Sequence, residues 1–239
     1  MLTIYIGYDE REPEAWEVCA YTLKKYASGA VNIQPLNLDK LEAQGLMTRE
    51  WSKKDGQMYD KISKAPMATK FAISRFLVPI IHQTGWAVFM DCDMIFQNDI
   101  YEIEKYLDDN YPVMCVHHDH QPTESVKMDN QIQTSYPKKN WSSVMAFNCD
   151  HPANNNLTLR AVNKHAGRDL HGFCWLHDDE IGELPREFNW LVNVQEKPEN
   201  PVICHYTLGG PWFPDWDAQP YDDLWINEQS EWINGYKYG

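Results

Sequence analysis

A short apolar run that ends in two carboxylates constrains the fold of this chain most strongly. Residues 86–90, Trp-Ala-Val-Phe-Met, are apolar at every position, and Asp91 and Asp93 follow directly. A strand that is apolar on both faces belongs at the centre of a parallel sheet covered by helices on both sides. The run therefore predicts an α/β protein with Asp91 and Asp93 at the carboxyl end of a central strand.

Strand and helix patterns alternate along most of the remaining sequence, which is typical of a sheet flanked by helices. Strands are predicted at residues 2–7, 31–38, 113–117, 143–148 and 202–206, and helices at residues 13–27, 66–81 and 153–165. The polar residues 45–60 are expected to form an excursion from the core. Residues 1–239 are expected to form a single domain, in which the Trp-rich residues 207–239 are an irregular C-terminal segment.

The charge balance excludes one large class of function. Asp and Glu number 35 against 21 Lys and Arg, so the net charge is −14. A phosphate backbone attracts positive surfaces, so no nucleic-acid partner is expected.

The sequence also bears on the compartment. The first residues contain neither a basic leader nor a small-residue cleavage site, and no stretch approaches the roughly 18 apolar residues of a transmembrane segment. The six cysteines are far apart and form no CxxC pair, which favours reduced thiols and a cytoplasmic location.

Asp91 and Asp93 have the spacing of a metal site. Residues i and i+2 of an extended chain point the same way, and ligands of open α/β sheets bind beyond the carboxyl ends of strands. Two adjacent carboxylates repel each other unless a cation lies between them, and Mg²⁺, Mn²⁺ or Ca²⁺ suits oxygen ligands. The alternative is that one carboxylate caps the following turn and the other is solvated.

A second segment bears on the same site. His205 ends the apolar strand predicted at 202–206, and Gly209 and Gly210 follow, where the backbone can approach a ligand closely. An imidazole beside two carboxylates shifts the expected ion from Mg²⁺ towards Mn²⁺. A histidine that donates to a backbone carbonyl at a turn is the alternative.

With these motifs in place, the chain resembles a GT-A fold glycosyltransferase of the retaining family that includes glycogenin and the bacterial lipopolysaccharide galactosyltransferases. The matching pieces occur in the family's order and span most of the chain. They are Tyr8-Asp9, residues 68–76, Asp91-Cys92-Asp93, residues 140–148, residues 178–181, residues 184–189 and residues 205–212.

The resemblance implies a mostly parallel Rossmann-like sheet and transfer of a sugar from a nucleotide-diphosphate sugar to a hydroxyl of a glycan or other acceptor, with retention. A uridine diphosphate donor is favoured. Asp91, Asp93 and His205 would hold Mn²⁺ or Mg²⁺ against the diphosphate. This agrees with the chemistry, because a metal ion neutralises charge on the leaving group.

The same match assigns roles to further residues. Tyr8 and Asp9 would hold the base and ribose, and Arg75 would pair with a carboxylate of the metal motif and approach the sugar. Five residues on an ideal helix separate Lys70 from Arg75 by about 140°, so the two side chains are not expected to serve one pocket. Arg75 is therefore ranked above Lys70. The remaining donor contacts are expected from Cys92, Gly209, Gly210 and Trp212, with an acceptor contact as a second possibility for Trp212.

Asp178 and Asp179 carry the most specific catalytic hypothesis. Asp178 would bind sugar hydroxyls, and Asp179 would be the nucleophile or the group that stabilises the oxocarbenium ion, because a carboxylate can attack an anomeric carbon. Three consecutive acids on a solvated surface are the alternative reading. Residues 121–139 are expected on the acceptor side of the site or as a lid.

The chain departs from the family at two places. Ser142-Ser143-Val144 replaces a small-residue segment, and the lysine expected after the late histidine is missing, so backbone amides of Gly209 and Gly210 are expected to replace its diphosphate contact. Two other functions stay open: a metal-dependent nucleotidyltransferase or phosphohydrolase, and a non-catalytic carbohydrate-binding protein.

Overall fold

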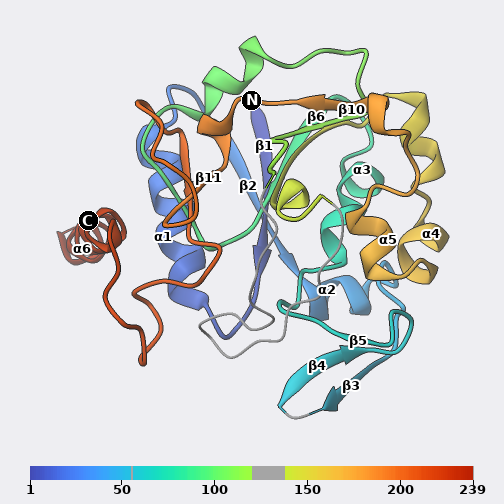
Figure 1. Ribbon diagram of the computed structural model, residues 1–239, viewed down its shortest axis with the longest axis horizontal. Coiled ribbons are helices and arrows are strands. Elements are labelled where there is room, and N and C mark those ends of the chain that lie inside the picture. The colour runs from blue at the N-terminus through green and yellow to red at the C-terminus, as the bar shows by residue number, and fades with distance from the viewer. Residues whose placement is uncertain (55, 120–137, 239) are drawn as a thin grey trace.

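A six-stranded sheet forms the centre of the structure, a computed structural model that describes residues 1–54, 56–119 and 138–238 (Figure 1). The strand order is β10-β8-β9-β6-β1-β2. Only β9 in this sheet runs antiparallel to its neighbours, so the predicted mostly parallel α/β sheet is confirmed. The strands are β1 (Leu2–Tyr8), β2 (Val31–Asn37), β6 (Trp86–Met90), β8 (Val113–Cys115), β9 (Val144–Asn148) and β10 (Ile181–Glu183).

Helices cover both faces of this sheet, as the all-apolar strand β6 requires. The helix α1 (Pro13–Tyr26) lies on one face, and α3 (Val78–His82), α4 (Leu159–Lys164) and α5 (Gly167–His171) lie on the other (Figure 1). A further short helix, α2 (Leu38–Ala43), follows β2. The 3₁₀ segments are η1 (Ser74–Leu77), η2 (Ile100–Lys105), η3 (Trp141–Ser143), η4 (Pro152–Asn156), η5 (Asp178–Glu180) and η6 (Arg186–Phe188).

A second, three-stranded sheet begins where the chain leaves β6. Its order is β11 (Trp190–Leu191), β12 (Ile203–His205) and β7 (Met94–Phe96), and β7 is antiparallel to β12. A small apolar cluster around Trp190, Tyr206 and Trp225 packs against it. The connection from β6 to β7 is Asp91-Cys92-Asp93, so the predicted metal motif lies at the junction of the two sheets.

The predicted excursion at residues 45–60 lies outside the main sheet, as a hairpin that projects from it (Figure 1). It consists of β3 (Trp51–Lys54) and β4 (Gln57–Asp60), and β5 (Ala65–Pro66) pairs with β4. A fully buried ion pair between Arg49 and Asp60 anchors the hairpin. The Arg49 guanidinium also donates to the carbonyls of Val162 (2.9 Å) and His165 (2.8 Å) beside α4.

The helix predicted at residues 66–81 is wrong. The chain turns through residues 67–73, and the α-helix begins only at Val78, with Pro79 in its first turn. Pro79 inside a longer helix would lack an amide donor and would clash with the carbonyl four residues earlier. The carboxylate of Asp9 also accepts a hydrogen bond from the Lys70 amide (3.0 Å), which takes that amide out of any helical ladder.

Two further expectations need correction. The helix predicted at 153–165 is split into η4 and α4, and the Thr158 side chain caps α4 by accepting from the Ala161 amide.

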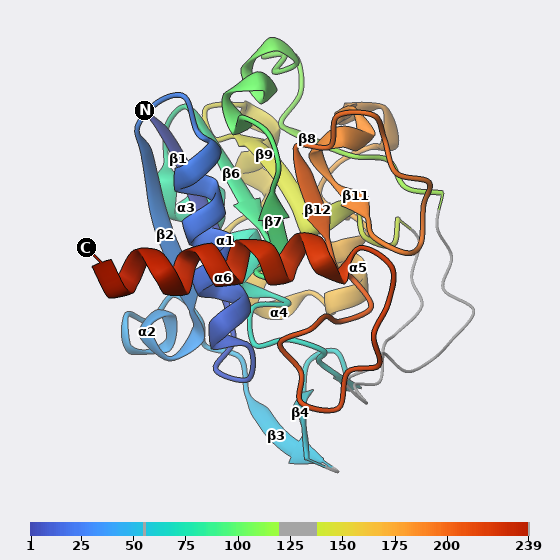
Figure 2. The ribbon, with the colours of Figure 1, turned by 90° about the vertical axis from the view of Figure 1, so that its left-hand side faces the viewer.

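Half of the segment predicted to be irregular, residues 207–239, is the helix α6 (Asp222–Tyr238), which lies across α1 (Figure 2). The inward face of α6 includes the buried Glu228, whose carboxylate accepts hydrogen bonds from Lys25 and Tyr26. This acidic residue interrupts the apolar periodicity that would predict a helix from the sequence.

Within the described residues, none of the helices combines the length and the apolar character that a bilayer-spanning helix needs.

We predict that Asp60→Asn lowers the free energy of unfolding by about 3 kcal/mol or more, because it leaves the Arg49 charge buried without its partner. Urea denaturation measures the change. The matched control is Glu50→Gln, which breaks the exposed pair with Lys61 and should leave the free energy of unfolding nearly unchanged, because solvent screens this pair. Equal effects of the two variants would contradict the anchoring role.

The same pair has a defined pH dependence. Burial alone would raise the pKa of Asp60, but hydrogen bonds from Arg49 and Ser63 outweigh it and hold that pKa below its usual value. The stabilisation by this carboxylate is therefore complete above the ordinary carboxyl pKa, about 4, and is lost as the pH falls through the lowered pKa.

Candidate functional site

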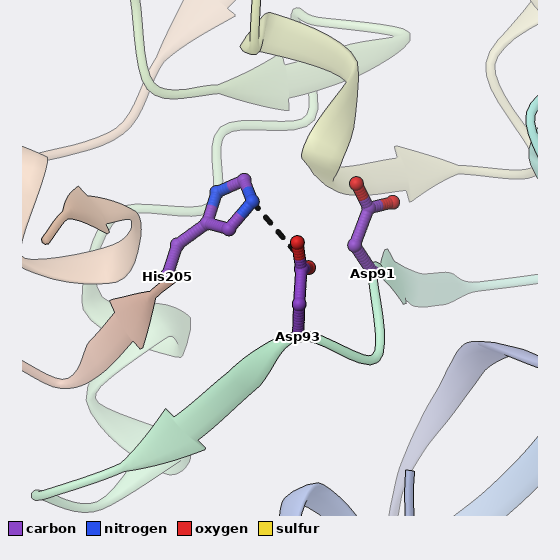
Figure 3. A group of neighbouring side chains, drawn as sticks. All are labelled: Asp91, Asp93 and His205. Carbon is purple, nitrogen blue, oxygen red and sulfur yellow. Dashed lines mark ion pairs between the residues drawn. The ribbon is translucent and has the colours of Figure 1, made fainter. Parts of the chain in front are cut away.

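Asp91, Asp93 and His205 converge at the junction between the sheets. The pairing of β7 with β12 places His205 opposite Met94, and the Tyr206 amide donates to the Asp93 carbonyl (2.9 Å). One ligand atom from each of the three side chains lies within 4.8 Å of the others. His205 Nε2 lies 3.4 Å from Asp93 Oδ1, and Figure 3 shows the imidazole facing the Asp93 carboxylate, with Asp91 beside them. The predicted convergence of these residues is confirmed.

The chemistry of this group fits a divalent cation. The Asp91 and Asp93 side chains are only 15% and 13% exposed, and the His205 side chain is 2% exposed. Two carboxylates held together at such low exposure favour an intervening positive charge. Two oxygens and one imidazole nitrogen are ligands that Mn²⁺ accepts. The group could therefore hold a divalent metal ion.

Arg75 neutralises part of the negative charge. Its Nη1 lies 2.8 Å from Asp91 Oδ1 and donates to the Ser142 carbonyl (2.8 Å), and the guanidinium lies over the Phe89 ring. The predicted pairing of Arg75 with the metal motif is thus present, whereas Lys70 pairs with Glu10 (2.6 Å). Lys70 and Arg75 do not share the predicted helix, and these contacts distinguish Arg75 from Lys70 instead.

Asn189 is a site residue that the sequence reasoning missed. Its Oδ1 lies 2.9 Å from His205 Nδ1, and because an amide oxygen only accepts, Nδ1 carries the proton and Nε2 presents its lone pair to the metal position. Asn189 is fully buried and donates to Ser143 Oγ (2.8 Å), while the Ser143 carbonyl accepts from the Asp91 amide (3.0 Å). One polar network therefore orients the histidine and one aspartate. The sequence analysis includes Asn189 in the matching piece 184–189 but assigns it no role.

Thr69 lines three hollows, and Asp91 or Asp93 also lines two of them. The first, called the Asp91 cavity, has a volume of about 260 Å³, and its wall includes Arg75, Asp91, Lys139, Asn140, Ser142 and Ser143. A small hollow lies between Asp93 and Gly209. The third, of about 400 Å³, lies between residues 10–11 and the hairpin. The mispredicted segment 67–73 contributes to the wall of each.

Asp9 does not present a free carboxylate to these hollows. Both of its oxygens accept from the Arg11 guanidinium (3.0 and 2.7 Å), one also accepts from the Lys70 amide, and the residue is fully buried. Burial alone would raise the pKa of Asp9, but these bonds hold it below its usual value. Tyr8 packs edge-on against Trp16, with 6.2 Å between the ring centroids, and does not line the three hollows. Contacts of Tyr8 and Asp9 with a base and ribose stay a prediction.

The predicted donor contacts after β6 and β12 differ in their surroundings. The Cys92 side chain is buried in the main core, so its thiol cannot contact a donor. Gly209 has a φ of +111°, which favours glycine, and it faces Asp93 across the small hollow. The Gly209 amide donates to the Tyr206 carbonyl (2.8 Å), so this amide is not the expected diphosphate donor.

Trp212 packs against protein. Its ring lies on Gly210 and against Tyr206 and Trp225, and its Nε1 donates to Glu12 (3.1 Å). A side chain at position 210 would collide with this ring, which explains the glycine there. A sugar contact by Trp212 stays a prediction.

Asp178 and Asp179 lie in η5, and both are exposed. Asp178 pairs with Lys138 (2.6 Å), and this lysine lowers the pKa of the carboxyl. Neither aspartate lines the Asp91 cavity. Their proposed catalytic roles stay predictions, and residues 121–137 of the predicted acceptor-side loop lie outside the described residues.

Comparison with solved structures defines the class of fold. The structure is similar to the bifunctional glycosyltransferase WbbM in its apo form, with a TM-score of 0.59 and 12% identity over 99% of this chain. It is also similar to the glycosyltransferase GlyE of Streptococcus pneumoniae TIGR4 (TM-score 0.59, 11% identity, 98% of this chain). A third match is the galactosyltransferase LgtC in complex with donor and acceptor sugar analogues (TM-score 0.55, 10% identity, 96% of both chains). This chain spans 51% of the WbbM chain and 62% of the GlyE chain. The chain has the GT-A glycosyltransferase fold, and the fold implied by the resemblance is confirmed.

Sequence comparison defines the family. No protein-family model matches the chain. The chain is 42% identical to Protein CDI of Arabidopsis thaliana over 235 aligned residues. The alignment covers 96% of this chain and 86% of Protein CDI. This chain therefore belongs to the family of Protein CDI.

We predict that Asn189→Leu weakens Mn²⁺ binding about tenfold or more, because His205 loses the acceptor that fixes its tautomer and ring orientation. Titration calorimetry with MnCl₂, without nucleotide, measures the affinity. The matched control is Asn154→Leu, at a buried asparagine that donates to the carbonyls of Pro112 and Asn148 away from the junction. An Asn189 variant that binds Mn²⁺ like the control would show that the ring is oriented without the amide.

Proposed function

We propose that this protein is a metal-dependent glycosyltransferase that moves a sugar from a nucleotide-diphosphate sugar to an acceptor hydroxyl. The observation that carries the proposal is the convergence of Asp91, Asp93 and His205 at the sheet junction of a GT-A fold, beside the Asp91 cavity.

In the proposed reaction, Asp91, Asp93 and His205 would hold a divalent ion, which would neutralise charge on the departing diphosphate. Asn189 keeps the His205 lone pair directed at the ion. Arg75 holds Asp91 in place and supplies a positive charge at the wall of the Asp91 cavity, where we place the sugar.

The finer assignments are part of the proposal. Mn²⁺ is preferred over Mg²⁺ because of the imidazole ligand, and a uridine diphosphate donor, a hexosyl group and retention follow from the family resemblance. The acceptor is a glycan or another hydroxyl compound. A cytoplasmic location is supported by six free cysteines, four of them buried thiols that serve as packing groups.

The two other functions receive less support. A phosphohydrolase or nucleotidyltransferase that uses two ions needs a second set of acidic ligands, and the described residues contain one candidate metal group. Carbohydrate-binding modules are mostly β-proteins, whereas this structure is an α/β sheet covered by helices on both faces.

We predict that uridine diphosphate with Mn²⁺ raises the melting temperature by about 5 °C or more at saturating concentration, and that neither component alone reproduces this shift. Asp93→Ala should abolish the shift because it removes a ligand that faces the diphosphate hollow. Glu199→Ala, at an exposed carboxylate, is the control and should shift like the wild type. Thermal-shift assays measure all three proteins.

An Asp93 variant that is stabilised as strongly as the wild type would remove the metal assignment. If no nucleoside diphosphate stabilises the wild type, the proposed donor class is wrong.

The role of Asp179 is tested by measuring donor affinity and the rate of sugar transfer separately. We predict that Asp179→Asn leaves the donor affinity unchanged and slows sugar transfer about a hundredfold or more, because an amide is a poor nucleophile and carries no negative charge. Asp178→Asn is the matched variant, and it should weaken donor binding instead. Transfer at the wild-type rate by the Asp179 variant would identify this residue as part of the solvated surface.

A further inference from the structure

Asn140 has a backbone conformation that few residues adopt. Its φ of +65° and ψ of −2° lie in the left-handed region, directly before η3. Glycine adopts this conformation without strain, and asparagine is one of the few other residues enriched there. Since glycine would satisfy the backbone, the conformation alone does not explain the carboxamide at this position.

The Asn140 carboxamide is engaged at one end. The residue is 7% exposed, and the Thr207 hydroxyl donates to Oδ1 over 3.4 Å. None of the described residues accepts a hydrogen bond from Nδ2. Nδ2 is also not one of the sealed side-chain atoms without a partner in the described part of the chain, so it is accessible. Because buried polar groups are nearly always hydrogen-bonded, this amide group is suited to an external acceptor.

The carboxamide lies at the wall of the Asp91 cavity. Asn140 lines this cavity together with Asp91, and it does not line the hollow between Asp93 and Gly209. The proposed function places the sugar in the Asp91 cavity and the diphosphate at the hollow beside Asp93. Nδ2 is therefore on the sugar side of the metal group.

Hydroxyl groups in the same wall are already used within the protein. Ser63 Oγ donates to Asp60 and accepts from the Gly167 amide (2.8 Å). Ser143 Oγ donates to the Asn140 carbonyl (2.6 Å) and accepts from Asn189 (2.8 Å). Nδ2 of Asn140 differs from these groups, because both of its hydrogens remain available to a ligand.

The rest of the wall suits a neutral sugar. Ser142 Oγ and His171 Nδ1 contribute a polar pair at 2.6 Å, while Ala65, Met67 and Ile73 contribute apolar surface. Small-molecule sites combine apolar walls with a few placed polar groups that fix the orientation of the ligand. A donor at Asn140 would supply such a group for one oxygen of the sugar.

We propose that Asn140 is a sugar-contacting residue, whose Nδ2 donates a hydrogen bond to an oxygen of the sugar bound in the Asp91 cavity. This inference rests on the proposed function for the placement of the sugar. The contact with Thr207 orients the carboxamide, and Thr207 lies two residues after the metal ligand candidate His205. The segment that contributes to the metal group therefore also directs the amide.

The test compares ligands with and without the sugar. Titration calorimetry in the presence of Mn²⁺ measures the affinities of UDP, UDP-glucose and UDP-galactose for the wild type and for Asn140→Gly, which keeps the backbone conformation and removes the carboxamide. We expect the variant to bind at least one of the two sugar nucleotides about five- to tenfold more weakly, as the loss of one hydrogen bond implies. UDP, and Mn²⁺ without nucleotide, should bind within about twofold of the wild type.

Two further variants complete the comparison. Asn140→Asp keeps the side-chain shape and the acceptor for Thr207 but has no N–H, so it should weaken the same sugar nucleotide at least as much. Asn193→Gly is the matched control, because Asn193 is an exposed asparagine with a φ of +61° that does not line the three hollows. It should bind every ligand like the wild type. Circular dichroism verifies that each variant folds.

Sugar-nucleotide affinities of Asn140→Gly that match the wild type would overturn the inference and leave the proposed function intact. An equal loss for UDP would also overturn it, because the amide would then serve the diphosphate, and an equal loss for Mn²⁺ alone would assign Asn140 a structural role at the metal group. A wild type that binds UDP but neither sugar nucleotide would show that the cavity does not receive the sugar. If the wild type binds none of these nucleotides, the proposed donor fails together with the inference.

Discussion

The repulsion between Asp91 and Asp93 is the constraint around which the site is built. The chain brings the two carboxylates together at low exposure where it passes from the six-stranded sheet to the three-stranded sheet. Arg75 offsets one of them, and the pairing of β7 with β12 brings His205 beside the other. The remaining negative charge favours a cation at this junction, and the proposed chemistry depends on it.

Buried polar groups, more than regular secondary structure, give the site its shape. Asn189 links His205 to the segment before β9. Asp9 and Asp60 hold the two ends of the irregular stretch 61–70, through the Lys70 amide and through Ser63. This stretch lines all three hollows around the junction. Buried carboxylates that are fully hydrogen-bonded can fix a loop as firmly as a helix would.

The distribution of charge is compatible with the anionic donor that we propose for this acidic chain. Cations line two of the hollows: Arg11, Lys53 and Lys70 at one, and Arg75, Lys139 and Arg168 at the other. A metal ion at the junction would add further positive charge between them.

The sequence alone determined the central sheet and the position of the metal motif, because an all-apolar run and carboxylates at i and i+2 express local geometry. It also indicated Arg75 and His205 through the order of the motifs. Only the tertiary structure decided the path of residues 66–81, the helix α6, the enclosure of Asp9 and the role of Asn189. In each of these cases at least one buried polar group has a partner that is distant in the sequence. Local periodicity therefore does not indicate the contact that determines the conformation.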